Sequence, residues 1–120
     1  MKVQAEEERA HAMKFYGYLY DRGGSVTFKA IAQPPAKFKS QIDVFRQVLD
    51  HELKITKSIT KLYELAVKEK DYPSQILLQW FINEQVEEEK NDSEIINQLS
   101  MLGESPVSLM MMDRRLAERK

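Results

Sequence analysis

Two motifs in this sequence place possible metal ligands at helical spacing. Glu8 and His11 form a Glu-x-x-His pair, which on a helix puts a carboxylate and an imidazole on one face within reach of a single ion. Glu84 and Glu88 lie one turn apart on a face that is otherwise apolar. Burying a carboxylate costs free energy unless the group is neutralised, paired or bound to a cation. The chemistry that these residues suit is therefore the binding of divalent cations.

Each motif alone has an ordinary explanation. A glutamate beside a histidine is more often a surface ion pair, and the run Glu87–Glu89 taken alone is usually a solvated helix face. Glu52 changes this interpretation, because it replaces a hydrophobic residue near the middle of another predicted helix. With Gln85 and Glu88 included, three helices direct oxygen or nitrogen ligands toward one layer. Several carboxylates in a dry layer would destabilise the fold unless divalent cations were bound there.

The available ligand types limit which metal this layer would bind. The sequence has no cysteine, which excludes a disulfide framework and a thiolate metal site. Carboxylate, imidazole and amide groups suit iron or manganese, with zinc as a competitor. We expect two ions, bridged by Glu8.

Length and composition predict a single domain, residues 1–120, without a nucleic-acid or membrane partner. The 120 residues carry a formal net charge of −1, which gives no electrostatic basis for binding nucleic acid or an anionic membrane. No apolar run is long enough to cross a bilayer, and the N-terminus lacks the apolar core of a signal peptide. We therefore expect a cytoplasmic protein.

The helices that must position the ligands are predicted from hydrophobic periodicity and from end signals. Ser40 is a candidate N-cap, Asp71–Pro73 a tight break and Gly103 a helix stop. The segment from Ser25 to Ser40 contains two prolines and no helical period, which predicts a long crossover loop after Gly24. The expected class is all-α, with three long helices and a short C-terminal one, over about Met1–Arg22, Ser40–Lys70, Pro73–Leu102 and Val107–Arg119.

Helical periodicity also predicts which side chains face inward. The inward face of the second helix is expected to contain Ile42, Phe45, Val48, Leu49, Glu52, Ile55, Ile59, Leu62 and Ala66. That of the third helix is expected to contain Leu77, Trp80, Phe81, Glu84, Glu88 and Ile95. We expect Trp80 to pack in the core rather than to relay electrons, since large aromatic side chains usually serve packing.

Three segments together resemble the second, third and fourth helices of the non-haem bacterial and archaeal ferritins. They are EEERAHAMKFYGYLYDRGG, LDHELKITKSI and LQWFINEQVEEEK, and the resemblance covers essentially the whole chain. It implies a ferritin-like helical bundle, a fold in which carboxylates on facing helices project inward and bind a pair of metal ions. It also implies a homo-oligomer, a cage built from dimers.

The resemblance implies roles for individual residues. Glu8 and His11 match the ligands of the first ferroxidase iron, with Glu8 also bridging to the second iron, and Glu52 and Glu88 match the ligands of that second iron. Gln85 matches the nearby amide. A third iron site, found in some of these proteins, would be held by Glu7, Glu84, Glu87 and Glu88. The implied cofactor is thus iron, two ions and in some relatives a third.

This chain differs at several positions from the motifs of bacterioferritins, rubrerythrins and animal ferritins, and these differences disfavour those relatives. Bacterioferritins and rubrerythrins have a second Glu-x-x-His pair where this chain has Gln85 and Glu88. The bacterioferritin haem ligand, a methionine, would fall at Arg9, so no haem is expected. The acidic pair of animal ferritin pores would fall near Gln75 and Leu78, so that iron entry route does not carry over.

The family's first long helix, which brings a further glutamate to the first iron, has no counterpart in this sequence. The resemblance of residues 1–4 to the middle of the family's second helix favours an N-terminally truncated chain over one whose groove is covered by another copy. We accordingly expect the first metal site to be incomplete and its iron oxidation slow.

Two functions remain open at this stage. The first is iron storage: a di-iron ferroxidase site oxidises Fe(II) to Fe(III) with dioxygen or peroxide, and ferric mineral is deposited in a multimeric shell. The alternative is a non-catalytic helical assembly module of the ferritin fold, in which the metal site is incomplete. Oxidation of added ferrous iron distinguishes them.

Overall fold

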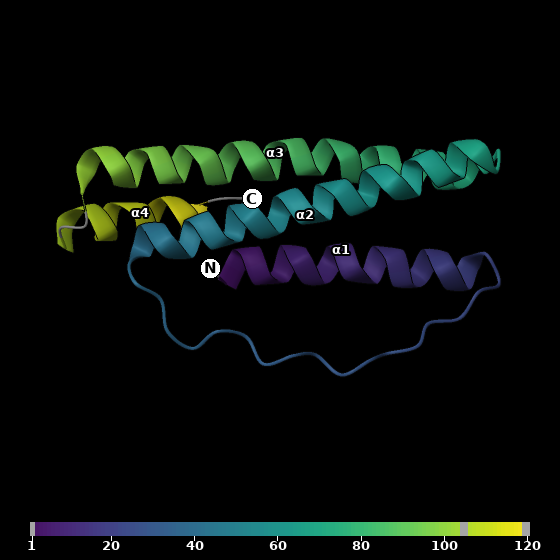
Figure 1. Ribbon diagram of the computed structural model, residues 1–120, viewed down its shortest axis with the longest axis horizontal. Helices are drawn as coiled ribbons and strands as arrows, with labels where there is room; N and C mark the ends of the chain where they lie inside the picture. Colours follow the sequence, from purple (N-terminus) through teal and green to yellow (C-terminus); the bar gives the residue numbers. More distant parts are fainter. Residues whose placement is uncertain (1, 104–105, 119–120) are drawn as a thin grey trace. The chain divides into compact units, whose positions relative to one another are not determined.

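A computed structural model describes residues 2–103 and 106–118, which form four α-helices and no strand. The helices are α1 (Lys2–Asp21), α2 (Gln41–Lys68), α3 (Tyr72–Leu102) and α4 (Pro106–Glu118) (Figure 1). The chain divides into two compact units, one holding α1 and α4 and the other α2 and α3. The all-α class is confirmed, and the helix ends lie close to the predicted residues. The predicted ends at Met1 and Arg119 lie outside the described residues.

Local hydrogen bonds explain where α2 and α3 begin. The Ser40 side chain accepts from the backbone N–H of Asp43 at 3.1 Å, as the sequence predicted. Asp71 caps α3 in the same way, accepting from the Ser74 N–H at 3.3 Å and from the Ser74 hydroxyl at 2.7 Å. Each cap satisfies a backbone N–H that has no partner within the helix and contributes about 1 kcal/mol.

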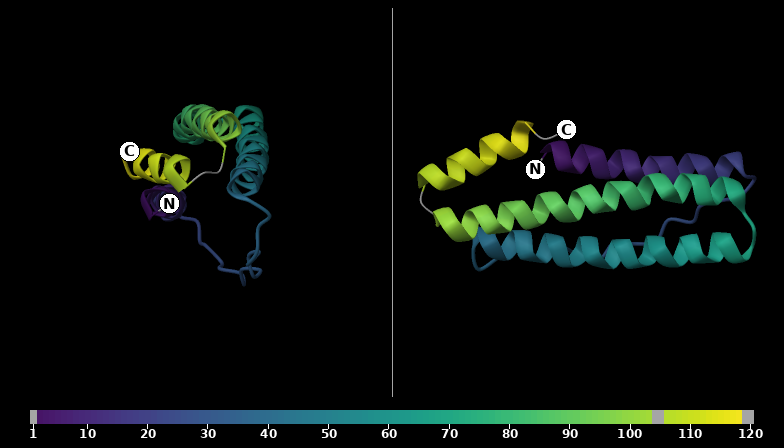
Figure 2. Two further views of the ribbon diagram at one scale, coloured as in Figure 1. Left: turned by 90° about the vertical axis from the view of Figure 1, so that its left-hand side faces the viewer. Right: turned by 90° about the horizontal axis from the view of Figure 1, so that it is seen from above.

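Glycine ends α3. Gly103 has φ of 73°, in the left-handed region that glycine adopts without strain, and its N–H donates to the Leu99 carbonyl at 3.0 Å. Lys70, in the short turn between α2 and α3, also has a positive φ, of 55°. This turn folds α3 back along α2, and the two helices run antiparallel and side by side (Figure 1 and Figure 2).

The contact between α2 and α3 follows a heptad spacing, which is the pattern of paired, slightly supercoiled helices. We call this line of buried residues the seam. On α2 they recur every seventh position: Phe45, Glu52, Ile59 and Ala66. On α3 they alternate between steps of three and four: Leu78, Phe81, Gln85, Glu88, Asp92, Ile95 and Leu99. The seam is apolar at both ends and polar in its middle.

The buried faces of α2 and α3 match the predicted ones at most positions and differ from them at the edges. Every buried residue of α2 was predicted to face inward, and so were Phe81, Glu88 and Ile95 of α3. Ile55 and Leu62 were also expected inside, but both are exposed, while Thr56 is half-buried. The apolar stripe on α2 is wider than the strip that one antiparallel helix covers, so part of the stripe stays outside the seam. On α3, Leu78 is buried although it was not predicted to be, and Trp80, expected in the core, is 38% exposed. Its ring meets Phe81 edge-on, with ring centroids 4.9 Å apart.

The other unit contains α1 and the start of the connection to α2. The helix ends at Asp21, and in the turn that follows the N–H groups of Gly23 and Gly24 donate to the carbonyls of Tyr20 and Leu19 at 3.0 and 2.8 Å. Residues 24–40 form the predicted connection without helix or strand, and Phe28 in it stacks on Tyr16 with ring centroids 6.0 Å apart. A hydrogen bond with Tyr20 raises the pKa of Tyr16. In the described part of the chain no helix has the length and apolarity that crossing a bilayer requires.

Candidate metal centre

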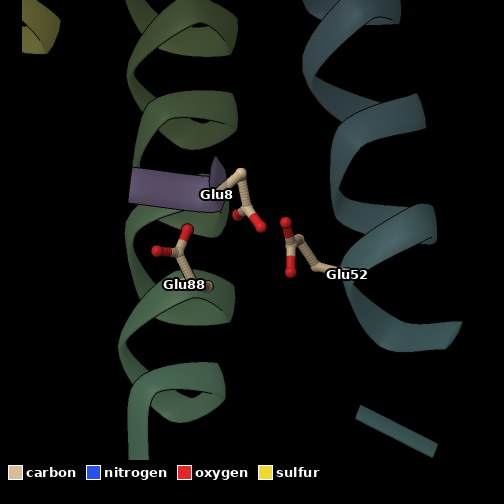
Figure 3. A group of neighbouring side chains, drawn as sticks. All are labelled: Glu8, Glu52 and Glu88. Atoms are coloured by element: carbon tan, nitrogen blue, oxygen red, sulfur yellow. The ribbon is translucent and has the colours of Figure 1, made fainter. Parts of the chain in front are cut away.

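Glu52 of α2 and Glu88 of α3 face each other at the middle of the seam. Both are buried, with 6% and 3% of their surface exposed. A carboxylate oxygen of one lies within 4.8 Å of a carboxylate oxygen of the other (Figure 3, which also draws Glu8 of α1). Two carboxylates held this close in a buried setting repel each other, and a divalent cation between them offsets the repulsion. The pair is thus a candidate metal centre to which α2 and α3 each contribute one carboxylate.

Gln85 holds one side of this centre. It lies one turn before Glu88 on the seam and is buried. Its amide nitrogen, Nε2, donates to the backbone carbonyl of Glu52 at 3.1 Å and to Oε2 of the Glu52 carboxylate at 3.0 Å. The amide predicted beside the second metal is therefore in direct contact with that metal's predicted α2 ligand.

Thr56 and Glu89 belong to the same hydrogen-bonded group, although the sequence did not single them out. Gln85 Nε2 also donates to Thr56 Oγ1 at 3.1 Å, and the Thr56 hydroxyl lies 2.6 Å from Glu89 Oε1. Both residues are half-buried. Thr56 follows Glu52 by four residues, and Glu89 follows Gln85 by four. That helical spacing is the signal that would have pointed to them.

Asp92 is a third residue that the sequence did not single out. It lies one turn after Glu88, on the seam, and only 2% of its surface is exposed. The three polar residues of α3 at the middle of the seam are therefore Gln85, Glu88 and Asp92. The spacing of four residues from Glu88 is the sequence signal for this position, but it is hard to recognise because Asp92 follows a run of charged residues.

The Glu-x-x-His pair lies on α1, in the other unit. As its spacing predicts, the two side chains meet: Glu8 Oε2 is 3.8 Å from His11 Nδ1. Glu8 Oε1 accepts from the Gln4 amide at 3.2 Å. His11 is half-buried and Glu8 is exposed. Glu7, also predicted as a ligand, is half-buried, and its Oε1 accepts no hydrogen bond from the described residues.

Glu84 and Glu87, the remaining predicted ligands, flank Glu88 on α3. Glu84 is half-buried and Glu87 is exposed. Neither lies on the seam, where the described acids are Glu52, Glu88 and Asp92. Their part in a third iron site stays a prediction.

Comparisons with known proteins agree on one family. A model of the ferritin-like domain matches residues 1–102. A bacterial non-heme ferritin of Staphylococcus haemolyticus (strain JCSC1435) is 40% identical over 116 residues, which are 97% of this chain and 70% of the relative. One of Staphylococcus aureus (strain USA300) is 37% identical over the same shares.

Solved structures agree with these sequence relatives. An open pore ferritin from the hyperthermophilic archaeon Archaeoglobus fulgidus is 39% identical, with a TM-score of 0.92 over all of this chain and 74% of that one. A humanized archaeal ferritin gives a TM-score of 0.93 at 38% identity, over all of this chain and 73% of that one.

Proposed function

Because this chain belongs to the non-haem ferritins, we propose that it stores iron, oxidising ferrous iron at a paired site before the ferric product is deposited inside a shell of identical subunits. The observation that carries the proposal is the buried pair Glu52 and Glu88, whose carboxylate oxygens lie within 4.8 Å of each other. A helix pair without a metal-binding role would place apolar residues at these positions of the seam.

Glu52 and Glu88 would bind the second iron, with Gln85 fixing the orientation of the Glu52 carboxylate. Glu8 and His11 would bind the first iron, with Glu8 shared between the two ions. The motif resemblance supports this addition of α1 residues, and so does the match of the entire chain to solved ferritins. Glu7, Glu84 and Glu87 would serve, together with Glu88, as a third site.

Iron is here the substrate and the cargo. Each ferrous ion gives up one electron, and dioxygen or peroxide accepts electrons from the pair. Fixed carboxylates favour this oxidation because they stabilise the higher charge of ferric iron more than that of ferrous iron. The protein's contribution is therefore the placement of negative charge and the exclusion of water by the apolar ends of the seam.

We propose further that the shell is assembled from dimers and that the protein works in the cytoplasm. The relatives' names as ferritins support the assembly, since closed symmetric assemblies of one chain are the usual form of soluble oligomers. Sedimentation of the purified chain tests the assembly directly. A monomer at all concentrations would contradict it.

Aerobic addition of ferrous iron tests the proposed reaction. We expect ultraviolet absorbance of ferric species to rise faster with the protein than in buffer alone. The variant Glu52→Ala should lose this acceleration while keeping its helices, because alanine is the stronger helix former. An assembled protein that does not accelerate oxidation, or equal rates with and without Glu52, would instead support a non-catalytic assembly module.

A further inference from the structure

We propose that Thr56 and Glu89 are positioning residues for Glu52, acting through Gln85, and that they determine how the Glu52 carboxylate presents itself to metal. This inference rests on the proposed metal-binding role of Glu52. It concerns four side chains of α2 and α3 that are joined by hydrogen bonds: Glu52, Gln85, Thr56 and Glu89.

The Thr56 hydroxyl has a single proton to donate. Two acceptors compete for it, the Glu89 carboxylate at 2.6 Å and the Glu52 backbone carbonyl at 3.0 Å. The shorter contact goes to a charged acceptor, and charge-assisted hydrogen bonds are roughly twice as strong as neutral ones. The proton is therefore directed at Glu89, and Thr56 Oγ1 is left to act as an acceptor.

The Gln85 amide is oriented by three neighbouring oxygens. Its Nε2 lies 3.0 to 3.1 Å from three oxygens, namely the Glu52 carbonyl, Glu52 Oε2 and Thr56 Oγ1. With the Thr56 proton turned to Glu89, all three are acceptors, so the donor end of the amide must face them. The reversed amide would place its own oxygen against the Glu52 carboxylate and lose every one of these bonds.

The consequence falls on Glu52. One carboxylate oxygen, Oε2, is held by the Gln85 amide, and this bond restricts rotation of the carboxylate about its terminal torsion. The carboxylate thus meets metal in one defined orientation instead of rotating between several geometries. Outer hydrogen bonds of this kind fix ligand orientation, and their removal typically lowers metal affinity about 10- to 100-fold.

An ordinary structural role for Thr56 has to be separated from this one. Threonines within helices often donate to the carbonyl four residues earlier, which is a local bond without any function. Thr60, one turn further along α2, makes that bond to the Thr56 carbonyl at 2.9 Å and is exposed. It has the same residue type as Thr56, lies on the same helix and has its hydroxyl at a similar distance from the carbonyl four residues earlier, but it stands outside the hydrogen-bonded group, so it provides a matched control.

The test uses anaerobic titration of the complete chain with Co(II), followed by visible absorption, which reports both affinity and coordination geometry. The variants are Thr56→Val, which keeps the shape and removes the hydroxyl, Thr56→Ser, which restores the hydroxyl, and Glu89→Gln. The controls are Thr60→Val and, for loss of an acidic charge, Glu64→Gln at an exposed position of α2.

We expect Thr56→Val to weaken Co(II) binding by about 10- to 100-fold and to shift the absorption band, as loss of an orienting hydrogen bond does. Thr56→Ser should restore both affinity and spectrum. Glu89→Gln should weaken Co(II) binding less, by about 10-fold. This loss of affinity should persist in high salt, which would screen a simple charge effect of the half-buried Glu89 carboxylate.

Two failures are distinguishable. If the unmodified chain does not bind Co(II), or if Glu52→Ala binds it equally well, the proposed metal centre itself is wrong. If Glu52→Ala loses a Co(II)-binding event but Thr56→Val and Glu89→Gln behave like Thr60→Val and Glu64→Gln, only the positioning role is overturned. Circular dichroism of each variant identifies a loss that comes from unfolding, and Thr56→Ser and Glu89→Gln then decide the question.

Discussion

The ends and the middle of the α2–α3 seam are built by the same two helices and the same heptad spacing, yet their side chains serve opposite purposes. At the ends, Phe81, Ile95 and Leu99 are buried apolar residues. In the middle, Glu52 meets Gln85 and Glu88, with Asp92 one turn away. Apolar burial stabilises the pair, whereas buried carboxylates destabilise it unless a cation or hydrogen bonds compensate. The comparison indicates that the ends support the fold and that the middle is maintained for binding.

The largest expected change in stability comes from truncating an apolar residue at an end of the seam. Leu99 is 1% exposed. Changing it to alanine should lower the free energy of unfolding by about 2 to 5 kcal/mol, because apolar burial is lost and a cavity is left. Urea unfolding at fixed chain concentration measures it. Co(II) affinity of the folded variant should stay unchanged. An unfolding cost below about 1 kcal/mol would show that this end contributes little to the fold.

Replacing the two acids at the middle of the seam with apolar residues should stabilise the metal-free protein. The double variant Glu52→Leu with Glu88→Leu continues the apolar seam and should raise the unfolding free energy of the metal-free protein by about 1 to 4 kcal/mol, the range for replacing buried charges with apolar groups. The same variant should no longer be stabilised by added metal. Destabilisation of the metal-free protein would mean that the acids support the fold, and the contrast between ends and middle would fail.

A change outside the seam should be smaller and should leave binding untouched. Ser40→Ala removes the N-cap of α2 and should cost about 1 kcal/mol. Its metal affinity should equal that of the unmodified chain, because the cap lies three turns before Glu52. A large loss of affinity from this variant would show that the centre is sensitive to any weakening of α2 and not to its own residues.

The local features of this fold were predictable from sequence because they depend on neighbouring residues. The cap at Ser40, the break at Asp71–Pro73 and the glycine stop at Gly103 are properties of a few consecutive side chains. The same holds for the meeting of Glu8 with His11, three residues apart on one helix. Each lies where the sequence placed it.

The edges of the buried faces and the hydrogen bonds across the seam were not predictable in this way. Ile55 and Leu62 have the chemistry of core residues, but which part of a wide apolar stripe is covered depends on the partner helix. The contact of Thr56 with Glu89 depends on the register of α2 against α3, which helical periodicity within each segment does not specify. The ligand types and the Gln85 amide beside them were readable from sequence, whereas Thr56 and Glu89, which contact that amide and each other, were not.

The most direct measurement of the central claim is anaerobic calorimetric titration of ferrous iron into the unmodified chain and into Glu52→Ala, Glu88→Ala and Glu64→Ala. We expect Glu52→Ala and Glu88→Ala each to lose an iron-binding event that the unmodified chain and Glu64→Ala retain. Equal binding isotherms for all four proteins would contradict it, because the buried pair at the middle of the seam would then have no part in holding iron.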